Sequence, residues 1–327
     1  MKVRVSVGTA SVLGLCRCRL DAEPTTAYLM LYHEGRCTAN CGFCPQARTS
    51  TARTDMLSRV VWPPYDLGEV SEALKVSKGL RRICVQVVNY PGFWGDLIQV
   101  VSELSDAGLP ISVCCQPVGR EMVWELRDMG VERVGIPLDA ATPELFDAVK
   151  GRSAGGPYTW RGHMEAIGEA LEVFGPWMVS THLIVGLGET ELEAVEFIQR
   201  MADMKVTTGL FAFTPVRGTR LEGLERPSLS SYRRVQLAHT LIYRGLSNLG
   251  RMEFDEEGRI TDFGVDRELL LDIVLSGEPF MTKGCPGCNR PFYNEDPGGP
   301  MYNYPYKPPK ERMVEEARML GLLDDAA

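Results

Sequence analysis

The chain has 327 residues, 44% of them hydrophobic, and a formal net charge of −8 at pH 7. This length allows one large α/β domain or two smaller ones, and this apolar content excludes an intrinsically disordered chain. The acidic balance, without a long Lys/Arg run, argues against a nucleic-acid partner. No stretch has the length of a membrane span, and the N-terminus lacks the apolar run of a signal peptide, so we expect a cytoplasmic protein with no membrane partner.

Patterns of buried strands alternate with amphipathic patterns along most of the chain. Apolar runs typical of buried strands occupy residues 28–32, 83–88, 110–115, 131–138, 179–185 and 208–213. Helical periodicity occurs at residues 97–107, 120–129, 159–174 and 192–204. Strands that alternate with helices pair in parallel through right-handed crossovers. The sequence therefore predicts an α/β fold, a full or partial (β/α) barrel of the TIM type, with its active site at the carboxyl ends of the strands.

After residue 250 the alternation of strand and helix patterns ends. Residues 252–260 are expected to form a small hairpin, and residues 284–309 are rich in Pro, Gly, Tyr and Asn. Long irregular segments in compact proteins are often functional. We therefore expect three regions, listed in chain order: an N-terminal extension at 1–26, a barrel core at 27–250, and an irregular, cysteine-bearing C-terminal extension at 251–327.

Three cysteines follow the first predicted strand in the pattern Cys37-x3-Cys41-x2-Cys44. Soft thiolate ligands suit iron–sulfur clusters and zinc. Three thiolates leave one iron of a four-iron cubane open, and an open position is what a catalytic metal site needs. The alternative is a zinc site with a fourth ligand from elsewhere, although zinc motifs usually show paired two-residue spacings. The triplet therefore favours a 4Fe–4S cluster.

Two further cysteine pairs lie near the ends of the chain. Cys285 and Cys288 are two residues apart in a Pro-Gly turn, a spacing that suits one metal or one edge of a cluster. Together with Cys16 and Cys18 they could hold an auxiliary cluster if the two ends meet over the barrel mouth. The alternatives are a zinc knuckle for the tail pair and no metal role for the N-terminal pair. The remaining cysteines lie in apolar runs and are interpreted as buried hydrophobic residues, Cys84, Cys114 and Cys115.

The triplet, with Phe43 before its last cysteine, resembles the signature of the radical S-adenosylmethionine (SAM) superfamily. The resemblance implies a 4Fe–4S cluster whose open iron binds SAM through its amino and carboxylate groups. It also implies one-electron cleavage of SAM to methionine and a 5′-deoxyadenosyl radical, which abstracts a hydrogen atom from the substrate. An electron donor such as ferredoxin or flavodoxin is implied as a partner. No catalytic residue beyond the cluster ligands is assigned.

Several segments resemble biotin synthase in particular, among them Cys44-Pro45-Gln46 and the motif Gly218-Thr219-x-Leu221. Biotin synthase also carries a second, sacrificial cluster inside its barrel. Cys84 matches one of its cysteines, and Cys114 or Cys115 matches another, but the fifth-strand cysteine falls on Ser180. Because this thiolate is missing, the sequence does not favour a biotin-type cluster. Cys84, Cys114 and Cys115 are therefore still interpreted as buried hydrophobic residues.

The same resemblance implies residues that contact SAM. Residues 183–190 resemble the segment that lies against the adenine, which selects Ile184 and Val185. Asp139 aligns with an Asp that contacts the ribose, although a cap of the helix that follows is an equal alternative. Asn89 and Tyr90 occupy the place of the motif that holds the SAM amino group, but the usual Glu is missing there.

The tail at residues 284–305, together with residues 8–15, resembles subunits of the two-protein lipoyl synthase of archaeal type. That resemblance implies a sulfurtransferase that converts a protein-bound octanoyl chain to lipoyl and consumes an auxiliary 4Fe–4S cluster. It implies an octanoylated lipoyl domain or H-protein as carrier and a second, related radical SAM subunit. The alternatives are biotin synthesis or another radical SAM reaction on a small molecule, and a non-enzymatic scaffold that holds zinc or a cluster.

Overall fold

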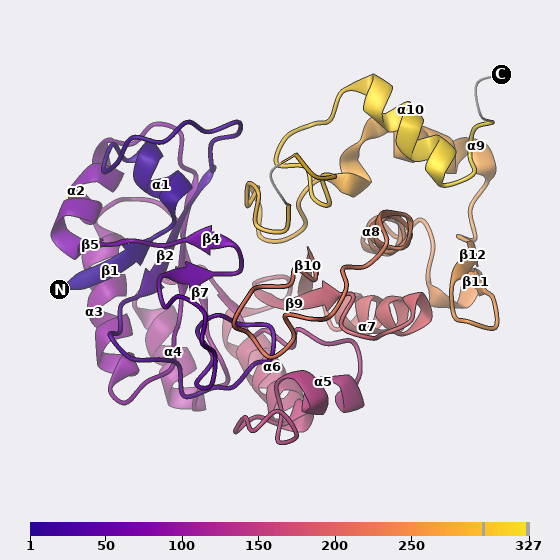
Figure 1. Cartoon of the computed structure of the whole chain (residues 1–327). Helices are drawn as coiled ribbons and strands as arrows, with labels where there is room; N and C mark the ends of the chain where they lie inside the picture. Colours follow the sequence, from indigo (N-terminus) through magenta and orange to yellow (C-terminus); the bar gives the residue numbers. More distant parts are fainter. Residues whose placement is uncertain (296–297, 325–327) are drawn as a thin grey trace.

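The computed structural model describes residues 1–295 and 298–324, so residues 296–297 and 325–327 of the expected C-terminal extension lie outside the described residues. One sheet of eight strands dominates the fold, in the order β10-β9-β8-β7-β6-β2-β1-β5 (Figure 1). Its strands are β1 (Lys2–Val5), β2 (Thr26–Leu31), β5 (Pro64–Asp66), β6 (Arg82–Gln86), β7 (Ile111–Cys114), β8 (Arg133–Gly135), β9 (Val179–Val185) and β10 (Thr207–Ala212).

Six of these strands pair in parallel from β2 to β10, and each coincides with one of the six predicted strands. The agreement is complete for β9, which covers Val179–Val185 as predicted. The sheet does not close, because β10 and β5 stand at its two ends. The prediction of an α/β fold is therefore confirmed, and the barrel takes the partial form rather than the full one.

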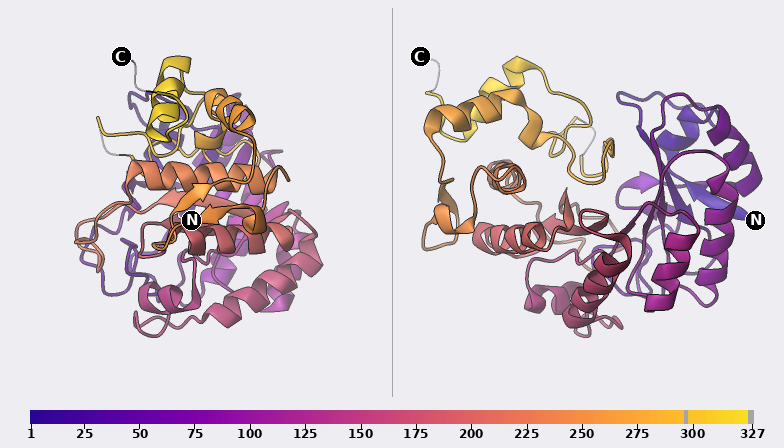
Figure 2. Two further views of the ribbon diagram at one scale, coloured as in Figure 1. Left: turned by 90° about the vertical axis from the view of Figure 1, so that its right-hand side faces the viewer. Right: turned by 180° about the vertical axis from the view of Figure 1, so that it is seen from behind.

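Helices follow the parallel strands as the alternating pattern predicts, and Figures 1 and 2 show α2 to α4 along the outer face of the sheet. The four amphipathic predictions correspond to α3, α4, α6 and α7. Thr190 begins α7 with a reciprocal capping box to Glu193, which fixes the turn that leaves β9. The helices are α1 (Val7–Val12), α2 (Leu67–Val76), α3 (Phe93–Ser105), α4 (Arg120–Asp128), α5 (Pro143–Val149), α6 (Trp160–Phe174), α7 (Glu191–Asp203), α8 (Leu229–Tyr243), α9 (Arg267–Ser276) and α10 (Lys310–Met319).

The first strand was not predicted from the sequence. β1 pairs antiparallel with both β2 and β5, and Val3 and Val5 are fully buried there. The expected N-terminal extension therefore contributes a strand to the main sheet, while the domain boundaries stay a prediction. Two short antiparallel pairs complete the strands: β3 (Met56–Leu57) with β4 (Val60–Val61), and β11 (Glu253–Phe254) with β12 (Ile260–Asp262). The second pair confirms the predicted hairpin.

Within residues 1–295 and 298–324, no helix is both long and apolar enough to cross a membrane.

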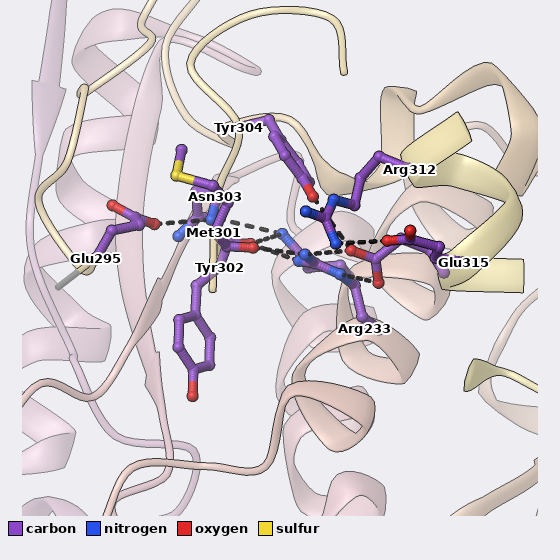
Figure 3. Close-up of polar contacts among 10 residues, drawn as sticks. Arg233, Glu295, Met301, Tyr302, Asn303, Tyr304, Arg312 and Glu315 are labelled. Atoms are coloured by element: carbon purple, nitrogen blue, oxygen red, sulfur yellow. Dashed lines mark hydrogen bonds and ion pairs between the residues drawn. The ribbon is translucent and has the colours of Figure 1, made fainter. Parts of the chain in front are cut away.

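A buried arginine fastens the C-terminal segment to the core (Figure 3). Arg233 of α8 is 0% exposed and pairs with Glu316 of α10 at 2.8 Å. Its guanidinium also donates to the backbone oxygens of Tyr302 at 2.7 Å and Met301 at 2.5 Å. Every polar group of this cluster has a partner, which is the condition under which a buried ion pair is tolerated. The irregular tail is thereby held at a defined place.

We predict that Arg233→Ala lowers the free energy of unfolding by about 3–5 kcal/mol, because it leaves Glu316 charged, buried and unpaired. The measurement is urea denaturation followed by circular dichroism. The matched control is Arg312→Ala, which removes the exposed Arg312–Glu315 pair of α10 in the same region. That control should cost about 1 kcal/mol or less. Equal losses in the two variants would contradict the role given to Arg233.

Candidate functional site

A cavity of about 250 Å³ lies among the parallel strands, the loop after β2 and the C-terminal segment. Most of its lining residues are apolar, and the charged side chains among them are Asp139 and Arg290. Eight of the ten cysteines line it, namely Cys37, Cys41, Cys44, Cys84, Cys114, Cys115, Cys285 and Cys288. The structure therefore gathers the predicted cysteine triplet, the predicted tail pair and the three cysteines interpreted as core around one space.

The triplet lies on a loop that is closed by its own hydrogen bond and held by two distant segments of the chain. The backbone N–H of Cys37 donates to Gln46 at 2.9 Å and closes the loop on itself. The N–H of Gly42 donates to Val149 at the end of α5 at 2.7 Å, and its carbonyl accepts from Leu221 at 3.0 Å. Because these partners follow different strands, the loop is fixed over the carboxyl ends of the sheet, where parallel α/β folds place their active sites.

Gly218 allows the loop after β10 to approach the cysteine loop closely. Its φ of +87° lies in the left-handed region, and a Cβ there would come within 2.5 Å of the Ala52 nitrogen. Its carbonyl accepts hydrogen bonds from Thr51 at 2.8 Å and Ser50 at 3.0 Å. Only glycine satisfies both conditions, which explains its place in the Gly218-Thr219-x-Leu221 motif.

The donor set of the triplet fits an iron–sulfur cluster. Burial raises the pKa of the Cys41 thiol to about 12 and also raises the pKa of Cys44. A bound metal reverses this preference, because a coordinating thiol is deprotonated. Among the described residues, no group of three or more His, Cys, Asp or Glu side chains is arranged to hold a metal ion. A polynuclear cluster instead distributes its thiolates over several irons.

Asp139 presents a buried carboxylate to the cavity from a strained backbone. Its φ is +69°, and it is 6% exposed. The ammonium group of Lys150, itself 0% exposed, pairs with Asp139 at 2.7 Å and also donates to the carbonyl of Pro137. The side chain of Thr142 caps α5, so the alternative interpretation of Asp139 as the cap is wrong. Asp139 is left facing the cavity, where a ligand can reach it.

His182 of β9 also lines the cavity, and its Nδ1 lies 3.8 Å from the Asp139 carboxylate. Burial lowers the pKa of His182 to about 4, although the charge of Asp139 acts in the opposite direction. The imidazole is therefore neutral at physiological pH, and Lys150 is the cation that compensates Asp139. Lys150 was missed by the sequence analysis, and its only signal was a lysine at the end of an apolar helical stretch.

Some of the predicted SAM contacts line the main cavity and others do not. Phe43, Asp139 and Ile184 line the cavity. Val185, the neighbour of Ile184 on β9, lines a separate cavity instead, since successive strand residues face opposite sides. Asn89 and Tyr90 are not among the lining residues of the main cavity.

Asn89 and Tyr90 make contacts within the protein. The amide nitrogen of Asn89 donates to the Tyr158 hydroxyl at 2.7 Å, while its buried Oδ1 has no hydrogen-bond partner among the described residues. The Tyr90 hydroxyl donates to Asp96 at 2.6 Å, and its ring stacks on His33 at a centroid distance of 4.2 Å. Of the two, only Asn89 keeps a free polar atom that a ligand could satisfy.

The tail bearing Cys285 and Cys288 contacts β2 on one side. The Tyr28 hydroxyl lies 3.3 Å from the Cys288 sulfur and accepts a hydrogen bond from the Arg290 nitrogen at 2.7 Å. Just before β2, the N–H of Thr25 donates to the Asn289 side chain at 3.0 Å. These contacts set the Cys-Pro-Gly-Cys turn against the first parallel strand.

The same tail contacts β10 at the other end of the parallel strands. The guanidinium of Arg290 donates to the Leu210 carbonyl at 3.2 Å and lies 3.8 Å from the centre of the Phe211 ring. The amide of Asn294 donates to the Ala212 carbonyl at 2.8 Å. The tail therefore contacts both β2 and β10, the first and the last of the parallel strands.

The N-terminal pair lies elsewhere. Neither Cys16 nor Cys18 is among the residues that line the cavity. The Cys16 sulfur lies 3.8 Å from the carbonyl of Val7, and Cys18 is exposed. The structure does not bring this pair to the cavity that Cys285 and Cys288 line.

Two biotin synthases resemble this chain in sequence. The chain is 26% identical to biotin synthase 2 of Polaromonas sp. (strain JS666) over 208 residues, which cover 61% of this chain and 57% of that protein. It is 24% identical to biotin synthase of Cupriavidus metallidurans over 278 residues, which cover 80% of this chain and 74% of that protein. The first match thus spans less than two thirds of the relative's length.

Two solved structures share the fold. Methylornithine synthase (PylB) superposes with a TM-score of 0.52 at 16% identity, over 68% of this chain and 63% of that one. The hydrogenase maturase HydG superposes with a TM-score of 0.51 at 13% identity, over 66% of this chain and 50% of that one. Identities this low establish the fold and not the reaction.

The family model of the radical SAM superfamily matches residues 31–201, from the end of β2 to α7. This stretch is just over half of the 327 residues and contains the cysteine triplet, Asp139 and Ile184. The chain therefore belongs to the radical SAM superfamily.

Proposed function

We propose that this radical SAM protein is a sulfur-inserting enzyme, a subunit of the lipoyl synthase type that converts a protein-bound octanoyl chain to a lipoyl group. One observation carries the proposal. The cysteine triplet and the cysteine pair of the tail face the same cavity, although more than two hundred residues separate them in the chain. An enzyme that joins a carbon radical to a sulfide needs the source of the radical and the source of the sulfur side by side.

Within this proposal, Cys37, Cys41 and Cys44 hold the 4Fe–4S cluster that binds SAM. Cys285 and Cys288 hold part of an auxiliary cluster. When bound, the first cluster would pass one electron to SAM to give methionine and the 5′-deoxyadenosyl radical that takes a hydrogen atom from the substrate, and the auxiliary cluster would supply the sulfide, with one of its ferric ions taking up the electron released as the C–S bond forms. The ligand role expected for the N-terminal pair, Cys16 and Cys18, has no support from the cavity lining.

The chain's own residues orient SAM and exclude water. Asp139, held by Lys150, accepts hydrogen bonds from the ribose hydroxyls, and Ile184 lies against the adenine. Phe43, on the same loop as the triplet, adds an aromatic ring to the cavity lining. An alkyl C–H bond is too weakly acidic for any side chain to remove as a proton, so the protein's contribution is to hold the reacting atoms in one dry space.

The remaining predictions belong to the same proposal. A barrel core at residues 27–250 carries the SAM site, the extension at 251–327 carries the tail pair, and the segment at 1–26 precedes the core. The partners are an octanoylated lipoyl domain or H-protein, a second related radical SAM subunit and an electron donor such as ferredoxin or flavodoxin. The cavity lining favours an acyl substrate, because the rings of Tyr293 in the tail and of Trp62 beside it add apolar surface to the cavity.

A second candidate is a biotin-synthase-like reaction on a small molecule. It is favoured by the names of the two relatives, both biotin synthases. It is disfavoured by Ser180, which lines the cavity where a biotin-type cluster would place a thiolate. The two candidates differ in the size of the substrate, which makes them separable by a direct assay.

We expect anaerobic enzyme with SAM, reductant and an octanoylated lipoyl-domain peptide to form 5′-deoxyadenosine and a peptide that has gained two sulfur atoms. The reaction is run with and without a related radical SAM subunit and read by mass spectrometry. The matched control replaces the octanoyl peptide by the peptide without its acyl chain. Sulfur incorporation into dethiobiotin but not into the peptide would instead establish the second candidate and remove the first.

We expect Lys150→Met to weaken SAM binding about ten- to a hundredfold, because it leaves the Asp139 carboxylate buried without its cation and a hydrogen bond to a charged group contributes about 1.5–3 kcal/mol. The dissociation constant is measured by titrating SAM into the anaerobic, cluster-loaded protein and following the EPR signal of the reduced cluster. Lys75→Met, which removes an exposed pair with Glu72 on α2, is the control and should bind SAM normally. An unchanged dissociation constant in folded Lys150→Met would exclude Asp139 from the SAM site.

A further inference from the structure

Cys84 lies beside the residue that contacts the tail pair. It occupies β6, where it is the register partner of Tyr28 on β2, so both side chains project to the same face of the parallel sheet. Both line the cavity. The Tyr28 hydroxyl in turn lies 3.3 Å from the Cys288 sulfur. Tyr28 therefore lies next to Cys84 of the sheet and contacts Cys288 of the tail.

The surroundings of Cys84 are polar and charged rather than those of a buried hydrophobic residue. The Gln86 amide lies 3.1 Å from the Cys84 sulfur and donates to it. Gln86, Cys285, Cys288 and Arg290 all line the cavity together with Cys84. The interpretation of Cys84 as an inert core residue does not explain why thiols from two distant segments converge on it.

We propose that Cys84, Cys285 and Cys288 together hold the auxiliary iron–sulfur cluster, with one ligand from strand β6 and two from the tail. This deepens the proposed function, which requires such a cluster but leaves its third thiolate unassigned. The assignment replaces the N-terminal pair, Cys16 and Cys18, as the source of further ligands.

The chemistry of the three positions agrees with a cluster of several irons. The thiolates come from a rigid strand and from a two-residue-spaced turn, a combination that suits soft iron. Arg290 lines the same cavity and brings a positive charge to the side where the three thiolates would be. Three thiolates would leave one iron of a four-iron cluster without a cysteine ligand.

Cys114 is the nearest competitor for the third position. It lines the cavity from β7, but its register partner on β6 is Gln86 rather than Cys84. Its sulfur lies toward the next strand, 3.5 Å from the Cβ position built on Gly135. Cys114 is therefore displaced from the tail pair by one strand, and Cys84 is preferred.

The test removes the SAM cluster first. A chain with Cys37, Cys41 and Cys44 replaced by Ser retains only the auxiliary cluster, and after anaerobic reconstitution we expect about four irons and four sulfides per chain. Adding Cys84→Ala to this variant should reduce both to near zero. Adding Cys114→Ala, or Cys16→Ala with Cys18→Ala, should leave both unchanged. Iron, sulfide and the Mössbauer spectrum are measured on each full-length chain.

The outcomes separate the two proposals. No iron in the parent variant would remove the auxiliary cluster, and with it the proposed function. About four irons retained after Cys84→Ala would overturn the ligand assignment alone. Folding is checked in the chain with an intact triplet, where Cys84→Ala should keep a reduced-cluster EPR signal that responds to SAM. Loss of iron with Cys114→Ala but not with Cys84→Ala would move the third ligand to β7 and contradict the assignment.

Discussion

The unpaired edge of strand β10 is the constraint on which the cavity depends. Among the strands of the described residues, β10 pairs only with β9, so its outer carbonyls need partners from outside the sheet. Arg290 and Asn294 supply them with side-chain donors. Side chains rather than another strand cover this edge, so the segment that carries them does not have to be a strand. Its Cys-Pro-Gly-Cys turn can therefore face the cavity.

Neither residue of the ion pair that fastens this segment, Arg233 or Glu316, lines the cavity. The buried Arg233–Glu316 pair joins α8 to α10 and fixes the backbone at Tyr302, so the tail is held on the C-terminal side of the turn that carries the cysteines. This arrangement explains why a charged pair is retained in a core position, where apolar residues of similar volume are often at least as stabilising.

Strained backbone is concentrated around the same space. Asp139 has a φ of +69° and Arg290 a φ of +33°, and both line the cavity. Non-glycine residues in this region cost free energy and persist only where the surroundings determine them fully. The Lys150 ion pair does so for Asp139, and the Tyr28 hydroxyl does so for the backbone of Arg290. Strain at both positions is consistent with a site that presents specific groups to a ligand.

The sequence by itself determined the parallel strands, the helices between them and the cysteine triplet, because each depends on residues close together in the chain. Period-two and helical patterns are local, and so is the spacing Cys37-x3-Cys41-x2-Cys44. The cap of the following helix was equally local, yet the sequence analysis considered Asp139 for it, and the structure shows that Thr142 is the cap.

Only the tertiary structure decided which distant residues share the cavity. The pairing of Lys150 with Asp139, the approach of Cys288 to Tyr28 and the register of Tyr28 with Cys84 all join segments whose separation no local pattern encodes. The tail was recognisable as irregular and cysteine-rich, but its place between β2 and β10 follows from the unclosed sheet. Burial and the need to satisfy the edge of β10 set that place, and neither can be read from the order of the residues.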